Sequence, residues 1–314
     1  MKPIFFAVMM MGAGLCAGEE TKPATGYTVP GTEERVVRSK AGEDYRILIS
    51  RPEGEAPEGG FPVMYVLDGD ENFLVITGIL RRLAGTRKAA RQNGIEPGIV
   101  VGIGYPGESR RDFDYTPQAP AGPPETYRDG RPYPPRPSGG ADAFFGFLEH
   151  ELKPAIEKDF PVDRGRQALY GNGFGGLFVL HVLFTHPEAF QGYVASSPSV
   201  WWNNRYILQE EKAFSARVKK EGAVAARLLI TVGEFEQSLT PLEAKWEENE
   251  REEHALKIGR RKMVDNTREM AWRLQSLEAA SGLSVTHRVF AGEGHASVAP
   301  MAVGPALSFA FPVR

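Results

Sequence analysis

Three short stretches in the second half of the chain carry residues that could together attack and split an ester or amide. The first is the glycine-rich turn at residues 171–176, GNGFGG. The second is a pair of acids, Glu234 and Glu236, which follows an apolar run, and the third is His295, which stands between glycines. A nucleophile, an acid and a histidine in that chain order form one of the recurring triads of hydrolytic enzymes.

The turn has the frame of a nucleophile elbow, G-x-S-x-G, but lacks its serine. Residues 167–170 predict a short buried strand before the turn, and residues 177–186 predict a helix after it, which Pro187 ends. Gly173 occupies the nucleophile position. An elbow nucleophile sits in a strained backbone conformation that glycine adopts without a Cβ penalty, so Gly173 should relax the turn while removing the attacking oxygen.

Two other interpretations of the same turn remain. Residues 171–176 also fit G-x-G-x-x-G, a dinucleotide-binding fingerprint, which requires an acidic residue at the end of the next strand. That strand, residues 192–195, is followed by Ser-Ser-Pro-Ser, which contains no carboxylate. We therefore expect no cofactor. The third interpretation is a glycine-rich turn that only allows close packing.

The histidine and the acid can be chosen by their positions. His295 is the only one of the six histidines placed on a loop between glycines after a strand, here residues 285–290. Glu236 is preferred to Glu234 because it lies a short turn beyond the strand at 228–232, although either could be a solvated carboxylate. Three serines near these stretches, Ser197, Ser199 and Ser297, are weaker candidates for a replacement nucleophile because none stands on an elbow.

Main-chain N–H groups could stabilise an oxyanion at this site. One is that of Phe174, the residue after the elbow position. A second would come from Gly69 or Asp70, which follow a continuous apolar strand at residues 61–67. The alternative is that the side chains of Asp68 and Asp70 only stabilise a turn and cap a helix.

Several of these motifs together resemble the putative-esterase branch of the α/β-hydrolases, and within it the periplasmic esterases of trilactone siderophores. The family elbow reads G-H-S-F-G-G, from which Asn172 and Gly173 depart. The resemblance implies hydrolysis of ferric trilactone–catecholate esters, with activity lost or residual; the alternatives are a non-catalytic siderophore-binding protein and an engineered inactive esterase. The matching stretches are residues 65–70, 110–117, 139–144, 171–176, 197–202, 263–266 and 292–295.

Four further residues are candidates for binding the substrate. Arg110 and Arg111 stand at the entrance of a Pro-, Gly- and Arg-rich loop, beside Tyr115, and Trp201 follows the strand after the elbow. Planar guanidinium groups and aromatic rings suit an anionic ligand with flat rings. The alternatives are two solvated arginines and a tryptophan in the core.

The elements that must position these residues predict an α/β-hydrolase fold. We expect a mostly parallel sheet of about eight strands with helices on both faces. An antiparallel pair at residues 34–39 and 45–51 opens it, and a further strand spans 98–105. Amphipathic helices are predicted at 71–91, 141–159 and 264–280, and a further helix is predicted at 203–220. The loop at 106–140 and a charged helical insertion at 242–262 interrupt the pattern, and the insertion could cap the site.

The amino terminus and the composition limit the cellular setting. Residues 1–17 have a basic start, an apolar centre and small residues at the end, typical of a secretory signal, and contain Cys16, the only cysteine. We therefore expect a periplasmic or secreted domain at 18–314 without thiol chemistry. The net charge of −3 offers no basic field for nucleic acid. We also expect no metal and no membrane span, and the oligomeric state is not indicated.

Overall fold

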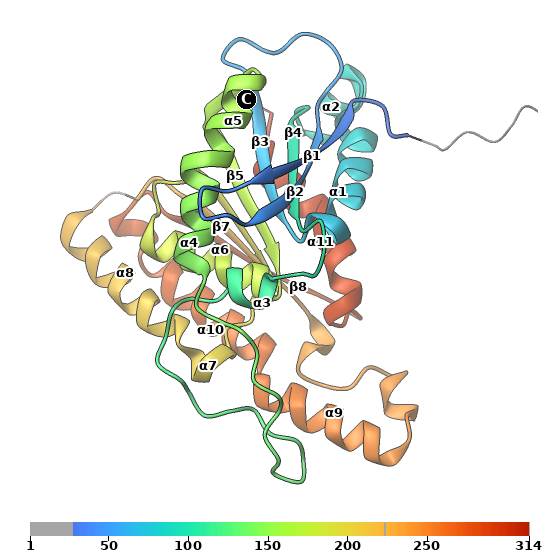
Figure 1. Ribbon diagram of the computed structural model, residues 1–314, viewed down its shortest axis with the longest axis vertical. Coiled ribbons are helices and arrows are strands. Elements are labelled where there is room, and N and C mark those ends of the chain that lie inside the picture. Colours follow the sequence, from blue (N-terminus) through green and yellow to red (C-terminus); the bar gives the residue numbers. More distant parts are fainter. Residues whose placement is uncertain (1–27, 223, 314) are drawn as a thin grey trace, which may run out of the picture. The chain divides into compact units, whose positions relative to one another are not determined.

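Within the part of the chain that the computed structural model describes, residues 28–222 and 224–313, eight strands form one sheet in the order β1-β2-β4-β3-β5-β6-β7-β8 (Figure 1). Strands β1 and β2 and strands β2 and β4 pair antiparallel, and all other pairs are parallel. The strands are β1 (Thr32–Arg38), β2 (Asp44–Ser50), β3 (Phe61–Leu67), β4 (Ile99–Gly104), β5 (Val162–Asn172), β6 (Gly192–Ser196), β7 (Arg227–Gly233) and β8 (Ser284–Phe290). The elements all lie in one unit that starts at Gly31.

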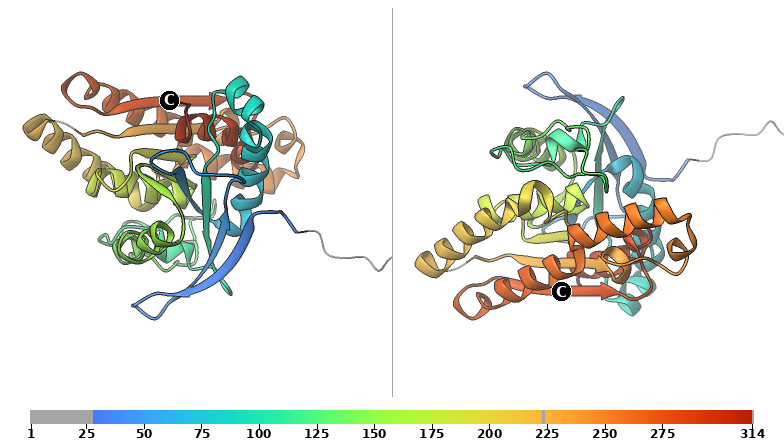
Figure 2. Two further views of the ribbon diagram at one scale, coloured as in Figure 1. Left: turned by 90° about the horizontal axis from the view of Figure 1, so that it is seen from above. Right: turned by 90° about the horizontal axis from the view of Figure 1, so that it is seen from below.

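Helices cover both faces of the sheet (Figure 2). One hydrophobic cluster joins α4, α6, α8 and α10 to one face, and a second joins α1, α2 and α11 to the other. The helices are α1 (Gly69–Ala84), α2 (Arg87–Asn93), α3 (Arg111–Asp114), α4 (Ala141–Phe147), α5 (Lys153–Asp159), α6 (Phe174–Thr185), α7 (Trp202–Arg205), α8 (Ile207–Glu221), α9 (Glu248–Arg261), α10 (Met263–Gln275) and α11 (His295–Ala310). This confirms the predicted fold class. Strands β3, β4 and β6 are buried along their whole length, as expected for apolar strands covered on two sides.

Several predicted helices have different bounds. The helix expected at 71–91 is two helices, because Gly85 follows α1 and the Thr86 side chain caps α2 by accepting from the N–H of Ala89. The helix expected at 141–159 contains a π turn, Leu148–Leu152, before α5. Pro154 has no N–H to continue the α-helical ladder there, which accounts for the wider turn.

Other differences lie close to the elbow. Strand β5 continues through Asn172, and α6 begins directly at Phe174, so the turn between them is the single residue Gly173. The segment expected as one helix at 203–220 starts instead with the short α7, in which Asn203 and Asn204 have left-handed backbone angles, before α8. His295 is the first residue of α11 and not a loop residue.

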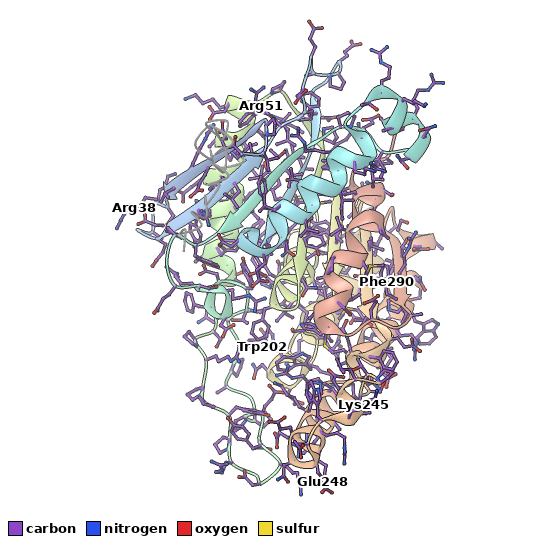
Figure 3. All side chains as sticks on the ribbon, turned by 90° about the vertical axis from the view of Figure 1, so that its right-hand side faces the viewer. Arg38, Arg51, Trp202, Lys245, Glu248 and Phe290 are labelled. Carbon is purple, nitrogen blue, oxygen red and sulfur yellow. The ribbon has the colours of Figure 1, made fainter. Side chains whose placement is uncertain are left out.

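Two insertions lie together beyond the carboxyl ends of the strands (Figure 1). The loop at 106–140 contains only α3 and an isolated bridge between Thr126 and Pro132. Its far half contacts α9 through ion pairs and hydrogen bonds, including Arg261 with Glu125 and the N–H of Arg128 with Glu253. Glu248, at the start of α9, lies well beyond the end of strand β8, which Phe290 marks (Figure 3). We call residues 125–136 and α9 the outer segments.

Candidate active site

The carboxyl ends of the parallel strands bring the three predicted stretches together. Parallel strands end at the same edge of a sheet, where loops can converge. Asn172 at the end of β5 is in register with Ser196 of β6, and Gly233 at the end of β7 is in register with Phe290 of β8. The residues that follow β5, β7 and β8 are Gly173, Glu234–Glu236 and residues 291–295, so the elbow, the acids and the histidine meet at this edge.

Gly173 has the backbone of a sharp strand-to-helix turn. Its φ is 60° and its ψ is −115°, a conformation that is costly for a residue with a Cβ. The turn is fixed from the neighbouring strand, because the Gly173 N–H donates to the carbonyl of Ser196 and the Gly173 carbonyl accepts from the N–H of Ser199, both at 3.0 Å. Two residues earlier, a Cβ at Gly171 would lie 2.3 Å from the main chain of Gly175, so the first turn of α6 requires glycine there.

A histidine–carboxylate pair faces this turn. Nδ1 of His295 lies 2.6 Å from Oε2 of Glu236, whose side chain is buried, whereas the His295 side chain is 56% exposed. The other ring nitrogen, Nε2, would lie 3.6 Å from a Cβ on residue 173. The imidazole therefore bridges the acid and the elbow, and its Nε2 lies where it can exchange a proton with a group above Gly173.

Glu236 is held by more than the histidine. Its Oε1 accepts from the N–H of Gly233 at 2.7 Å and from the hydroxyl of Ser197 at 2.5 Å. Ser197 thus orients the acid, and its hydroxyl is directed to Glu236 instead of to the elbow. The Glu234 carboxylate accepts from the N–H of Gly292 at 2.8 Å, which ties the loop after β7 to the loop after β8.

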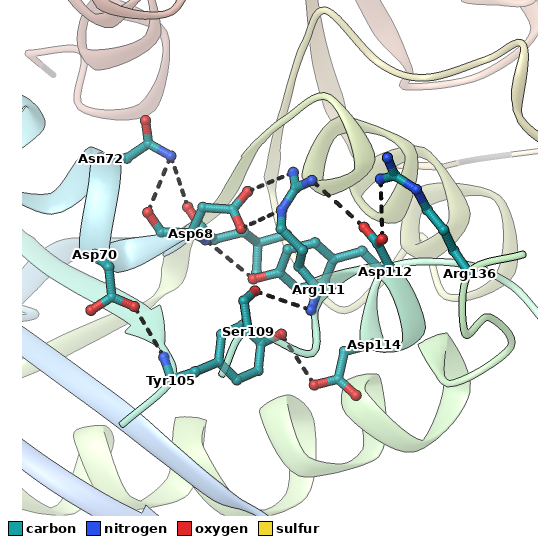
Figure 4. Close-up of polar contacts among 11 residues, drawn as sticks. Asp68, Asp70, Asn72, Tyr105, Ser109, Arg111, Asp112, Asp114 and Arg136 are labelled. Carbon is teal, nitrogen blue, oxygen red and sulfur yellow. Dashed lines mark hydrogen bonds and ion pairs between the residues drawn. The ribbon is translucent and has the colours of Figure 1, made fainter. Parts of the chain in front are cut away.

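Arg111 reaches the elbow from α3. Its Nε and Nη2 hold the two carboxylate oxygens of Asp68 at 2.9 and 3.1 Å (Figure 4), and its Nη2 would lie 3.8 Å from a Cβ on Gly173. Burial raises the pKa of Asp68, and the Arg111 guanidinium opposes that rise. Burial also acts against the charge of Arg111, but the Asp68 carboxylate outweighs it, so the pKa of Arg111 is raised and the guanidinium stays charged. The sequence interpretation had given Asp68 only turn and capping roles and had missed this pair, although an acid directly after a buried strand signals a need for a cation.

Tyr115 and Arg110 lie where they stabilise the fold around the site. Tyr115 is fully buried, and its hydroxyl accepts from the N–H of Asp68 at 3.2 Å, so the expectation that it would face a ligand is wrong. Arg110 pairs with Glu43 and with the buried Asp114, which also accepts from the hydroxyl of Tyr105. The guanidinium of Arg110 is therefore already paired with two carboxylates of the protein itself.

Trp201 forms a wall between the elbow and α9. The guanidinium carbon of Arg261 lies 3.8 Å from the centre of the Trp201 ring, and the ring of Phe174 lies 5.9 Å from it on the elbow side. Arg111 lies 5.6 Å from the Phe174 ring. From α9 to α3, the two neighbouring rings of Trp201 and Phe174 thus lie between the two cations, Arg261 and Arg111. The sequence interpretation treated Arg261 only as part of the charged helical insertion at 242–262 and did not assign it to this wall.

The amide groups predicted as oxyanion donors lie at the ends of two helices. Phe174 is the first residue of α6, and Gly69 and Asp70 begin α1 directly after Asp68, whose φ is 50°. The Asp70 carboxylate is engaged by the guanidinium of Arg46 and the N–H of Tyr105. A Cβ on Gly175 would lie 3.4 Å from the Leu67 side chain, so the end of β3 does lie against the first turn of α6. The role of these amides remains a prediction.

The described part of the chain bears on two predicted absences, a metal site and a membrane-spanning helix. Residues 28–222 and 224–313 contain no group of three His, Cys, Asp or Glu side chains placed to hold a metal ion. Over the same residues, no helix has the length and apolar character required to cross a bilayer. The predicted signal at 1–17 and Cys16 lie outside the described residues.

The fold and this site define the α/β-hydrolase class. The chain belongs to the family whose model is described as "Putative esterase", which matches residues 39–274.

Two curated relatives cover most of the chain. It is 39% identical over 290 residues to the ferri-bacillibactin esterase BesA of Bacillus subtilis, with 90% of this chain and 91% of the relative covered. It is 33% identical over 304 residues to the siderophore triacetylfusarinine C esterase of Aspergillus fumigatus, with 91% and 95% covered. These matches extend over nearly the whole of both relatives.

Two solved structures also match nearly the whole of the chain. The BES protein from Bacillus cereus superposes with a TM-score of 0.75 at 35% identity, covering 92% of this chain and 98% of that chain. The siderophore hydrolase EstA from Aspergillus nidulans superposes with a TM-score of 0.77 at 29% identity and the same coverage.

Proposed function

We propose that this chain binds ester-linked siderophores at the elbow and hydrolyses them slowly, with a water molecule as the attacking group in place of a serine hydroxyl. The observation that carries this proposal is the intact His295–Glu236 pair, whose free ring nitrogen faces the side-chain-free Gly173. The names of the relatives, which are esterases of ferri-bacillibactin, triacetylfusarinine C and enterobactin, support the substrate class.

The proposed reaction uses His295 as the proton carrier. Glu236 accepts a hydrogen bond from the Nδ1–H of His295, which fixes the tautomer and keeps Nε2 available as a base. Nε2 takes a proton from water above Gly173, the resulting hydroxide adds to the ester carbonyl carbon, and the imidazolium then returns the proton to the leaving alkoxide. The N–H of Phe174, with that of Gly69 or Asp70, would stabilise the oxyanion.

The expected rate is low because the covalent step is lost. Enzymes with a disabled triad retain about 10³–10⁴-fold acceleration over water from the oxyanion hole and substrate binding. Removal of the base should then abolish most of what remains. The wall of Arg111, Phe174, Trp201 and Arg261 supports an anionic substrate with flat rings, such as a ferric trilactone–catecholate.

A non-catalytic binding protein is the second candidate, and Gly173 itself favours it. The three serines considered as replacements are placed otherwise: Ser197 donates to Glu236, the Ser297 hydroxyl lies 3.0 Å from the N–H of Gly294, and Ser199 is buried. A protein with this site could hold the siderophore without opening it.

The two candidates are separated by mixing the purified protein with ferric enterobactin and following both binding and release of the linear product. Slow product release that disappears in His295→Ala supports the hydrolase. Tight binding with no product above the His295→Ala background supports the binding protein. Gly173→Ser should restore turnover on aryl esters and trilactones, and a Gly173→Ser protein inert on both would contradict an esterase site at this elbow.

We also propose the cellular setting. Residues 1–17 would be a signal that is removed on export, leaving a single domain at 18–314, with the loop at 106–140 and the charged insertion at 242–262, in the periplasm or outside the cell. Mass spectrometry of the protein recovered from each cell fraction tests this. An intact Met1 on the cytoplasmic protein would contradict it.

A further inference from the structure

The space above Gly173 is bordered by nitrogen atoms. The three atoms nearest to a Cβ on this residue are Nε2 of His295 at 3.6 Å, Nη2 of Arg111 at 3.8 Å and Cε1 of His295 at 3.8 Å. None of the three is a carboxylate or carbonyl oxygen. The edge of the imidazole and the tip of the guanidinium therefore both lie near the position of the missing Cβ, and both can donate hydrogen bonds.

These groups have hydrogen-bonding capacity left for a ligand. Nη2 of Arg111 carries two N–H groups, and Asp68 accepts one of them at 3.1 Å. Nδ1 of His295 is engaged by Glu236, which leaves Nε2 for the space above Gly173. The N–H of Phe174 begins the 12-residue helix α6 and has no protein acceptor among the described residues.

The donors are fixed before any ligand arrives. Asp68 holds Arg111 by two hydrogen bonds, and Glu236 is itself held by Gly233 and Ser197. Each of the two acids thus already has a partner in the protein, Arg111 for Asp68 and His295 for Glu236. A flat ligand with two acceptor oxygens and one negative charge matches three donors in this arrangement better than a neutral ester does.

We infer that the space above Gly173 is a carboxylate-binding site, formed by Nε2 of His295, Nη2 of Arg111 and the N–H of Phe174. A serine would fill this space with its own Cβ and hydroxyl, so the site exists because residue 173 is glycine. In this complex Nε2 of His295 donates a hydrogen bond to the carboxylate, whereas in the proposed hydrolysis it accepts a proton from water. The identity of the acid rests on the proposed function: it would be the free carboxyl group of an opened siderophore ester.

The first test uses acetate and acetamide, which have the same shape and differ in charge. Each is titrated into the purified protein while the Phe174 amide is followed by NMR. Acetate should shift this amide at concentrations about tenfold or more below those at which acetamide does, because charge-assisted hydrogen bonds are the stronger ones. Equal binding of the two probes, or equal displacement of acetate by chloride, would overturn the inference.

The second test fills the space. Gly173→Ala places a methyl group there in ordinary van der Waals contact and should weaken acetate binding by about tenfold or more. Gly94→Ala is the matched control, since Gly94 also has a positive φ, 65°, and has no atom within 4 Å of its missing Cβ. Unchanged acetate affinity in Gly173→Ala would count against the site. The comparison of acetate with acetamide needs no variant, so it decides the question even if Gly173→Ala does not fold.

The outcome is independent of ester turnover. Selective acetate binding by a protein that never opens ferric enterobactin would support the carboxylate site and contradict the proposed hydrolysis. Turnover of ferric enterobactin without selective acetate binding would support the proposed hydrolysis and contradict the carboxylate site. If both hold, the linear product should bind more tightly than the intact trilactone by about tenfold, and acetate should compete with the linear product alone.

Discussion

The elbow region and the outer segments lie at the same end of the sheet but are held by different kinds of interactions. At the elbow the acid is buried: the Glu236 side chain is almost completely enclosed and accepts three hydrogen bonds, although the His295 side chain is itself exposed. In the outer segments, α9 has no buried residue, and its contacts with residues 125–136 are made by partly or fully exposed charges. Buried hydrogen bonds are costly to break, whereas exposed ion pairs contribute little and are screened by salt. The site should therefore be rigid and the outer segments separable from it.

The largest effect is expected from Glu236→Ala. This change leaves the Ser197 hydroxyl, the Gly233 N–H and the His295 ring without their acceptor, and it should lower the free energy of unfolding by about 3–5 kcal/mol. Glu234→Ala is the control, because it removes one exposed hydrogen bond to Gly292 and should cost less than about 1 kcal/mol. Urea denaturation measures both. Equal losses of unfolding free energy in the two variants would show that the hydrogen bonds of Glu236 contribute no more to stability than that of Glu234.

A second large effect is expected on the pH dependence of stability, which His181 in α6 should control. Burial opposes the charged form of this ring, but the hydrogen bonds that it donates to Asp142 and Glu210 outweigh burial and raise the pKa of His181 to about 9. Since the folded pKa lies above the ordinary value of about 6.5, the stabilisation is fully present below pH ~6.5 and is lost as the pH rises through ~9. It should amount to about 3 kcal/mol.

The measurement compares the wild type with His181→Asn between pH 6 and pH 10. The difference in unfolding free energy should be largest at pH 6 and should shrink toward pH 10. A difference that is constant over this range would mean that the ring is held neutral. Asp142 lies two residues beyond the loop at 106–140, so its contact with His181 also anchors the end of that loop to α6.

A moderate effect is expected at Gly173. Serine there must adopt φ 60° and ψ −115°, which should cost about 1–3 kcal/mol and lower the melting temperature. A protein whose melting temperature is unchanged or higher after Gly173→Ser would show that this turn stores no strain.

The smallest effect on global stability is expected in the outer segments. Glu253→Ala removes the acceptor of the Arg128 N–H and of the Tyr133 hydroxyl, yet it should change the unfolding free energy by less than about 1 kcal/mol. Hydrogen exchange in residues 125–136 should nevertheless accelerate, and 1 M salt should reproduce part of this acceleration. Arg131→Ala is the control, because Arg131 pairs with Asp129 inside the loop and not with α9. Comparable acceleration in both variants would argue against docking by α9.

The sequence predicted the sheet better than the contacts at its edge. Apolar runs and chain order were sufficient for the strand at 61–67 and for the meeting of Gly173, Glu236 and His295 at one edge, because parallel strands leave little freedom there. The Asp68–Arg111 pair joins residues 43 positions apart through a loop whose path no local pattern specifies. Tyr115 was misplaced for the same reason. The start of α6 was set three residues late because a glycine-rich stretch reads as a turn, although tertiary contacts at Gly171 and Gly175 stabilise a helix there.

Strand β8, which precedes His295, has a single neighbour. It lies at the border of the sheet and pairs with β7 alone, and Val289 near its end is 44% exposed. The acid, by contrast, follows β7, an interior strand paired on both sides. Partial unravelling of the border would therefore carry the base away from an acid that stays in place. Heat or denaturant should therefore abolish any reaction at this site before the rest of the protein unfolds. A covalent link that fixes β8 to β7 should extend the temperature range of activity more than additional packing in the core would.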